Sequence, residues 1–119
     1  MSQRTEKVQE LAREVLGEAI AELKDPRVGF ATVTAVRIST DLRHARVYVS
    51  VLGSEEEQSS TMAGLRSAAP HLRSELGRQV RLKYLPELIL ELDTGAQEAE
   101  RLEGLLRKIH GEEETRPEG

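Results

Sequence analysis

An apolar stripe that runs through a proline constrains this chain more than any other feature. Within residues 61–92, apolar side chains recur every three or four residues, as on one face of a helix, at Met62, Leu65, Ala69, Leu72 and Leu76. Pro70 interrupts this stripe, and a proline removes a backbone donor and clashes with the carbonyl four residues before it. The pattern therefore predicts two helices that share one buried face, with an interruption formed by Ala68, Ala69 and Pro70.

The residues after this stripe are predicted to end the second helix and to begin a strand. Gly77 follows Leu76 in the position where a left-handed glycine often caps a helix. Beyond it, apolar and basic side chains alternate, as in a half-buried strand, over Val80, Arg81, Leu82, Lys83 and Tyr84. We therefore expect a strand at residues 80–84 with Arg81 and Lys83 on its outward side.

The upstream part of the chain predicts one long helix and a β-hairpin. Apolar residues recur at helical spacing over residues 8–23, so this helix needs a sheet or other helices to cover it. Gly17 lies inside that helix, where we attribute it to close packing against a neighbour. Residues 28–39 and 45–52 are rich in β-branched residues, and the short turn between them predicts an antiparallel pair. Ser54 and Glu57 have the spacing of a capping box, which marks the next helix start.

Positive charge is concentrated in one segment although the whole chain is acidic. Residues 62–85 contain five basic residues and one acidic residue, whereas the formal net charge of the chain is −4. Residues 86–119 contain ten acidic and four basic residues. Because local potential steers encounters, overall acidity does not exclude an anionic partner. The alternative is that the basic residues are only the solvated faces of a helix and a strand.

Length and composition indicate one soluble domain. The 119 residues suit a single core, no apolar run reaches the roughly 20 residues of a membrane span, and the first residues lack the apolar region of a signal peptide. The absence of cysteine excludes disulfides and thiolate chemistry. We expect a cytoplasmic protein with one domain over residues 1–110, in which residues 96–109 have the spacing of an extra C-terminal helix. Residues 111–119 are expected to form a disordered acidic tail.

The sequence contains no arrangement of residues that is typical of catalysis. Its three histidines, His44, His71 and His110, have no metal-ligand spacing, so neither a metal site nor a cofactor is predicted. No glycine-rich phosphate loop follows a strand, and no serine has the context of a nucleophile elbow. Most carboxylates fall on helix exteriors or in the tail, where solvation explains them. We therefore predict a protein that is not an enzyme and has no small-molecule substrate.

Three stretches match one protein family in order and spacing: DPRVGFATVTAVRIST at 25–40, DLRHARVYVSVLG at 41–53 and LRSELGRQVRLKYLPELILELD at 72–93. Within them, the pattern Asp-Leu-x-x-Ala-x-Val-Tyr-Val occupies residues 41–49, and Arg-Leu-x-x-x-Pro-Glu-Leu occupies residues 81–88. On these residues the chain resembles the ribosome-binding factor A family from about residue 6 to residue 109.

The resemblance implies an α+β fold of the KH-like type II, an αββααβ sandwich with a three-stranded sheet and its helices on one face. It also implies a monomeric assembly factor that binds free 30S ribosomal subunits through 16S rRNA during late maturation and 16S rRNA processing, with a role in cold shock adaptation. The family has an Ala-x-Gly kink between the two central helices. Ala68 matches the first position of that kink, and Pro70 stands where the family has glycine.

Charge placement and resemblance together predict an RNA-binding surface made of Arg66, Arg73, Arg78, Arg81, Lys83, Arg43 and Arg46. With only two tyrosines and one phenylalanine in the chain, recognition of folded RNA through shape and phosphates is favoured over an extended base-stacking platform. An alternative function is a small α/β module that binds another protein through its acidic C-terminal segment. Salt dependence separates the two, because phosphate contacts weaken steeply as salt rises and an apolar protein interface does not.

Overall fold

The computed structural model describes residues 3–93 and residue 95 of the 119-residue chain. Within these residues it contains three helices and three strands in the order αββααβ. They are α1 (Gln3–Ala21), β1 (Ala31–Ile38), β2 (His44–Val51), α2 (Glu55–Ser67), α3 (Ala69–Gln79) and β3 (Glu87–Leu92). The expected C-terminal helix at 96–109 and the expected disordered tail at 111–119 lie outside the described residues.

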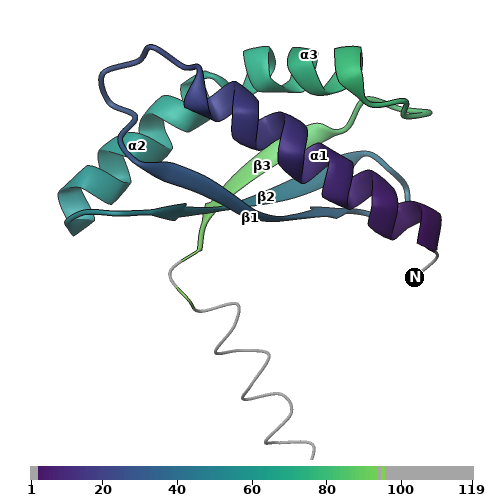
Figure 1. Ribbon diagram of the computed structural model, residues 1–119, viewed down its shortest axis with the longest axis horizontal. Helices are drawn as coiled ribbons and strands as arrows, with labels where there is room; N and C mark the ends of the chain where they lie inside the picture. The colour runs from purple at the N-terminus through teal and green to yellow at the C-terminus, as the bar shows by residue number, and fades with distance from the viewer. Residues whose placement is uncertain (1–2, 94, 96–119) are drawn as a thin grey trace, which may run out of the picture.

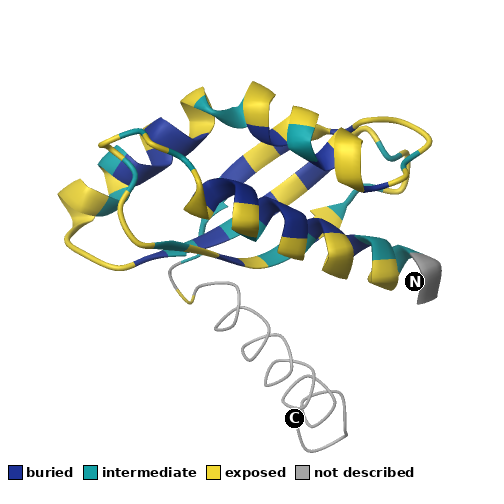
Figure 2. Ribbon diagram, turned by 45° about the horizontal axis from the view of Figure 1, so that its top comes forward, coloured by how far each residue is buried: buried dark blue, intermediate teal, exposed yellow. Residues whose placement is uncertain are grey.

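The strands form one sheet in the order β1-β2-β3, and the helices cover one of its faces (Figure 1). β1 and β2 are antiparallel, whereas β2 and β3 are parallel. A parallel pair requires a crossover connection, and α2 with α3 supplies it. Along β2, buried and more exposed residues alternate (Figure 2), and the buried ones are Ala45, Val47, Val49 and Val51. This is the KH-like α+β sandwich that the sequence predicted.

The hairpin predicted between the first two strands is confirmed. Val33 of β1 pairs with Val49 of β2, and a β-bulge follows Val33. In the turn, the Asp41 carboxylate accepts hydrogen bonds from a hydroxyl and a backbone amide, and both bonds lower the pKa of Asp41. Leu42 has a φ of 64°, which bulky residues rarely adopt. Its side chain lines an apolar hollow between the turn, α1 and the α3–β3 loop, and this burial helps to offset the strain.

Two helical glycines differ in whether packing requires them. A Cβ placed on Gly17 in α1 would have no heavy atom within 4 Å, so the predicted close packing at Gly17 is wrong. A Cβ placed on Gly64 in α2 would instead lie 2.8 Å from Val28 Cγ2. Close approach of the backbone therefore occurs where α2 packs against the loop after α1.

The start of α2 has the predicted capping box. Ser54 Oγ accepts a hydrogen bond from the Glu57 amide at 3.2 Å, and the Glu57 carboxylate accepts one from the Ser54 amide at 3.0 Å. These bonds to Ser54 lower the pKa of Glu57, with the backbone amide as the larger cause. The helix start is thus stabilised in the way that the spacing of the two residues indicated.

The predicted interruption between the central helices is confirmed at Ala68. α2 ends at Ser67, α3 begins at Ala69, and Ala68 between them has φ −86° and ψ 0°. Pro70 lies in the first turn of α3, where the helix needs no amide donor from it. The apolar stripe continues across the interruption, because the core contains Met62, Leu65, Leu72 and Leu76.

The helix end and the strand predicted after Leu76 are both wrong. α3 continues beyond Gly77 to residue 79, and β3 begins only at residue 87. Leu85 packs so closely on Gly77 that an added Cβ would lie 3.1 Å from Leu85 Cδ1. Val80 is buried one helical turn after Leu76, so the apolar periodicity of the helix continues to its C-cap. Residues 80–86 form a loop in which Val80 is buried and Leu82 is half-buried, whereas Arg81 and Lys83 are exposed, so this part of the loop has the alternation of a strand.

Candidate nucleic-acid interface

The hairpin turn, the first turns of α1 and the α3–β3 loop meet at one end of the sheet (Figure 1). Neighbouring hollows at this end are lined by residues from all three segments and by Arg73 and Arg78 of α3. We call this region the basic end and define it by Arg43, Arg73, Arg78, Arg81 and Lys83. The tertiary structure therefore brings together five of the seven basic residues that were predicted to bind RNA.

Arg81 and Lys83 are the cations of the basic end that are most available to a partner. Both side chains are exposed, and neither forms an ion pair with a carboxylate in the described part of the chain. Leu82 between them is half-buried and lines the apolar hollow beside Leu42. The outward direction predicted for the two cations is thus confirmed, although a loop and not a strand produces it.

Tyr84 is a feature of the basic end that sequence reasoning missed. The centre of its ring lies 5.3 Å from the Arg43 guanidinium carbon and 5.7 Å from Lys83 Nζ. Both distances are within the range of cation–π attraction. Its neighbour Lys83 was visible in the sequence, but Arg43 lies in the hairpin turn and only the fold brings it to the ring.

Arg73 and Arg66 make hydrogen bonds to backbone carbonyls around β3. Arg73 donates from Nε to the Pro86 carbonyl at 3.0 Å and from Nη2 to the Leu85 carbonyl at 2.8 Å. Arg66 Nη2 donates to the Leu90 carbonyl at 3.1 Å. β3 is an edge strand of the described sheet, and such contacts cover carbonyls that would otherwise be open to pairing. Both arginines therefore have a structural role that the charge count did not reveal.

The remaining predicted residues have different surroundings. Arg78 Nη1 lies 2.7 Å from a Glu75 carboxylate oxygen on the exposed side of α3. Arg46 lies on β2 in register with Arg37 of β1 and Ile89 of β3, on the sheet face that the helices leave open. Arg46 and Arg66 are thus the two predicted residues that do not belong to the basic end.

The helix interruption offers little for direct contact with a partner. Ala68 and Ala69 are half-buried against the core, and the Ala68 amide donates to carbonyls of α2. Pro70 is exposed but has no amide proton. The three residues predicted as the kink therefore lie at the junction of the two helices, and they present no free backbone donor at Ala68 or Pro70.

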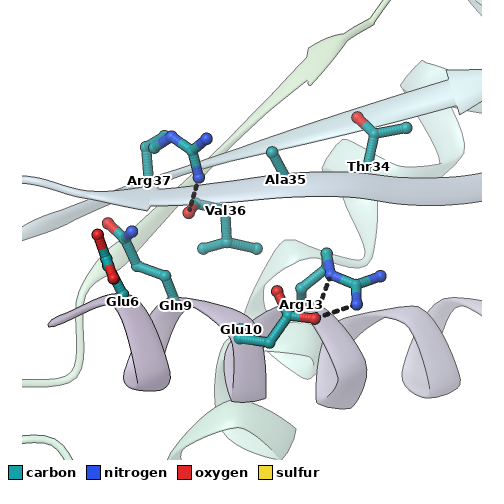
Figure 3. Close-up of a pocket in the computed structure, with 8 residues that line it drawn as sticks. All are labelled: Glu6, Gln9, Glu10, Arg13, Thr34, Ala35, Val36 and Arg37. Atoms are coloured by element: carbon teal, nitrogen blue, oxygen red, sulfur yellow. Dashed lines mark hydrogen bonds and ion pairs between the residues drawn. The ribbon is translucent and has the colours of Figure 1, made fainter. Parts of the chain in front are cut away.

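Another hollow, of about 250 Å³, lies between α1 and β1 (Figure 3). The buried side chain of Gln9 accepts a hydrogen bond from the Ile38 amide at 2.9 Å, which covers a donor of β1. Glu10 and Arg13 are paired on the helix beside it, and this hydrogen bond lowers the pKa of Glu10. Two carboxylates and two guanidinium groups line this hollow, so it favours an anionic ligand less than the basic end, where the cations outnumber the carboxylates.

Other site types are not supported by the described residues. Over residues 3–93 and 95, no group of three or more histidine, aspartate or glutamate side chains is placed to hold a metal ion. The described helices are also too short or too polar to cross a membrane.

Comparison with known proteins identifies the family. The sequence model of the family described as Ribosome-binding factor A matches residues 4–106. The chain belongs to the ribosome-binding factor A family. It is 41% identical to Ribosome-binding factor A of Geobacter metallireducens over 114 residues, which are 95% of this chain and 97% of that protein. It is 46% identical to Ribosome-binding factor A of Brevibacillus brevis over 96 residues, which are 81% of this chain and 79% of that protein.

Solved structures of ribosome-binding factor A have the same fold. The Thermus thermophilus crystal structure has a TM-score of 0.68 and 32% identity, over 74% of this chain and 94% of that one. The Thermotoga maritima solution structure has a TM-score of 0.71 and 34% identity, over 80% of this chain and 92% of that one. A homology model of the Thermus thermophilus factor was fitted into a cryo-EM map of a 30S–RbfA complex. It has a TM-score of 0.58 and 35% identity, over 70% of this chain and 88% of that one. The resemblance inferred from sequence is therefore confirmed.

Proposed function

We propose that this protein is an assembly factor of the small ribosomal subunit, which binds free 30S subunits through 16S rRNA during late maturation and 16S rRNA processing. It acts in the cytoplasm as a monomer, without catalysis or a cofactor, and supports growth in the cold. Membership in a family named for ribosome binding supports the partner, as does the relative fitted into a map of a 30S complex.

The basic end is the surface through which we propose that the protein binds RNA. Arg81 and Lys83 are exposed and lack carboxylate partners among the described residues, and Arg43 lies close by across the ring of Tyr84. Unpaired cations of this kind neutralise phosphates and release counterions, which provides affinity without sequence readout. Arg73 holds the loop in place, and we assign it a positioning role in this surface.

Cosedimentation of the purified protein with small subunits, large subunits and whole ribosomes tests the partner. We expect binding to free small subunits that weakens as salt rises, as phosphate contacts require. Retention at high salt would instead favour the alternative function, a module that binds another protein through its acidic C-terminal segment. Sedimentation with large subunits alone would contradict the proposal.

Charge reversal locates the surface. The double variant Arg81→Glu/Lys83→Glu should change the free energy of unfolding by about 0.5 kcal/mol or less per exposed site. It should weaken binding, and the salt slope should fall by roughly one for each phosphate that the variant no longer neutralises. Lys83→Glu and Lys24→Glu make a matched pair, since both lysines are exposed and Lys24 follows the C-terminal end of α1, which lies away from the basic end (Figure 1).

Only the variant at the basic end should lose affinity, and circular dichroism should first confirm that both proteins are folded. A folded double variant with the affinity and salt slope of the wild type would place the RNA surface elsewhere. The next candidate is then the open sheet face around Arg46.

A further inference from the structure

Tyr84 is an exposed aromatic residue that the core does not use. Its side chain is 45% exposed, and it is not among the residues that form or border the hydrophobic core. The chain has one other strongly exposed aromatic residue among the described ones, Phe30, which is 82% exposed and has no cation over its ring. Tyr84 differs because Arg43 and Lys83 lie at 5.3 Å and 5.7 Å from its ring centre.

The backbone that follows this ring is held in place. Arg73 donates to the carbonyls of Leu85 and Pro86, the two residues that follow Tyr84. The Glu87 amide donates to the Arg43 carbonyl at 2.8 Å, which ties the start of β3 to the hairpin turn. These bonds thus hold the backbone that carries the ring next to the backbone of the hairpin turn, while the side chains of Arg43 and Lys83 remain exposed. A ligand that binds there has little backbone ordering to complete.

The space beside the ring has the chemistry of a nucleotide site. A hollow of about 390 Å³ is lined by Arg43, His44, Arg73, Tyr84, Leu85 and Glu87, and its volume is within the 300–1,000 Å³ of typical small-ligand sites. An aromatic face stacks on any nucleobase, while neighbouring cations contact the backbone phosphates. The Glu87 carboxylate is exposed and lies 4.0 Å from His44 Nε2, and as a hydrogen-bond acceptor it suits the amino groups on a base edge and not a phosphate. A phosphate alone would use the cations but leave the ring and the carboxylate without a role.

We propose that Tyr84 is a stacking platform for one unpaired nucleotide of RNA, with Arg43 and Lys83 as contacts to its flanking phosphates. The base replaces one of the two flexible cations on the ring face, and the displaced side chain remains within reach of the phosphate backbone. This proposal rests on the proposed function, and it adds a requirement for an unpaired nucleotide to a surface otherwise expected to recognise shape and charge.

Tyrosine fluorescence of the full chain tests the stacking directly. The chain has two tyrosines and no tryptophan, so Tyr48→Phe leaves Tyr84 as its only strong emitter. A single-stranded oligoadenylate should quench this emission as it binds, because the base stacks on the ring. An RNA duplex of equal length should bind through charge with much less quenching. Equal quenching by both RNAs, or none by either, would overturn the proposal.

Substitution at Tyr84 tests the same contact on the subunit. Tyr84→Ala should lower the affinity for small subunits by about 5-fold to 150-fold, the equivalent of about 1–3 kcal/mol at 1.4 kcal/mol per tenfold change. Tyr84→Phe retains the ring and should bind close to wild type. Phe30→Ala removes an even more exposed aromatic residue, which lies just before β1 and away from the hairpin turn, and should leave the affinity unchanged.

These outcomes separate the site from the function. If the wild type binds small subunits and Tyr84→Ala binds equally well, the stacking site is refuted and the proposed function stands. The same holds if Tyr84→Phe loses as much affinity as Tyr84→Ala, because the hydroxyl and not stacking would then matter. If oligoadenylate quenches Tyr84 while the wild type fails to sediment with small subunits, the site stands and the proposed partner is wrong.

Discussion

Replacing Arg73 by methionine should destabilise the loop that carries the basic end. The guanidinium donates to the Pro86 carbonyl at 3.0 Å and to the Leu85 carbonyl at 2.8 Å, and these bonds tie α3 to the start of β3. Methionine keeps much of the apolar stem but has no donor. The variant therefore removes the two hydrogen bonds while it preserves most of the packing.

The size of the effect follows from the burial of the two carbonyls. Pro86 is buried, whereas Leu85 is partly open to water that replaces the missing donor. A hydrogen bond from a charged group contributes about 1.5–3 kcal/mol, and an exposed one contributes less, so we expect a total loss of at least about 1.5 kcal/mol. For a domain of this size, 1 kcal/mol shifts the unfolding midpoint by about 4–8 °C, so the midpoint should fall by at least about 6 °C.

Thermal unfolding followed by circular dichroism measures this loss, with Arg78→Met as the matched control. Arg78 lies on the same helix, its side chain is 70% exposed, and its guanidinium pairs with the Glu75 carboxylate and with no backbone carbonyl among the described residues. Such an exposed pair contributes about 0–1 kcal/mol, so the control should unfold near the wild-type temperature. If both variants unfold at the same midpoint, the carbonyl contacts of Arg73 do not stabilise the fold, and its assignment as a positioning residue is wrong.

Three further predictions concern the helices. Gly17→Ala should raise the free energy of unfolding by about 0.5–1 kcal/mol, because the new methyl group meets no atom and alanine favours a helix; a lower urea midpoint would refute this. Pro70→Leu should extend α2 into α3 and raise the helical signal in far-UV circular dichroism, and an unchanged signal would assign the interruption to packing around Ala68. The pKa of Glu57 is lowered from 4.5 by its hydrogen bonds to Ser54, so the stability that it contributes is present above that pH and is lost as pH falls through the lowered pKa. The wild type should therefore lose its greater free energy of unfolding relative to Glu57→Gln as the pH falls below 4.5. A difference in free energy of unfolding that does not change with pH would contradict this.

The elements that the sequence predicted correctly are those encoded within a few residues. The apolar spacing of α1, the alternation of β2 and the capping box of Ser54 and Glu57 each depend on neighbours within about one or two turns or a single strand. The interruption at Pro70 is equally local, because a missing amide donor and a steric clash act within the same helix. Gly17 was misinterpreted because whether a neighbour lies against a glycine depends on tertiary packing.

The strand predicted at residues 80–84 shows where local pattern is ambiguous. Val80 and Leu82 alternate with Arg81 and Lys83 in both a strand and a loop that packs inward, so periodicity alone does not distinguish them. Pairing decides the question, and β2 pairs with residues 87–92 and not with 80–84. That choice depends on how far α3 continues before the chain returns to the sheet.

The sequence by itself determined the family, the order of the elements and the concentration of positive charge after the hairpin, since all three are properties of consecutive residues. Only the tertiary structure decided which of those charges are available to a partner. Arg73 and Arg66 bind carbonyls 13 and 24 residues away in the chain, while Arg43 reaches the ring of Tyr84 from a different loop. Charge is a property of the residue type, but its availability depends on which donors and acceptors the fold places within hydrogen-bonding distance.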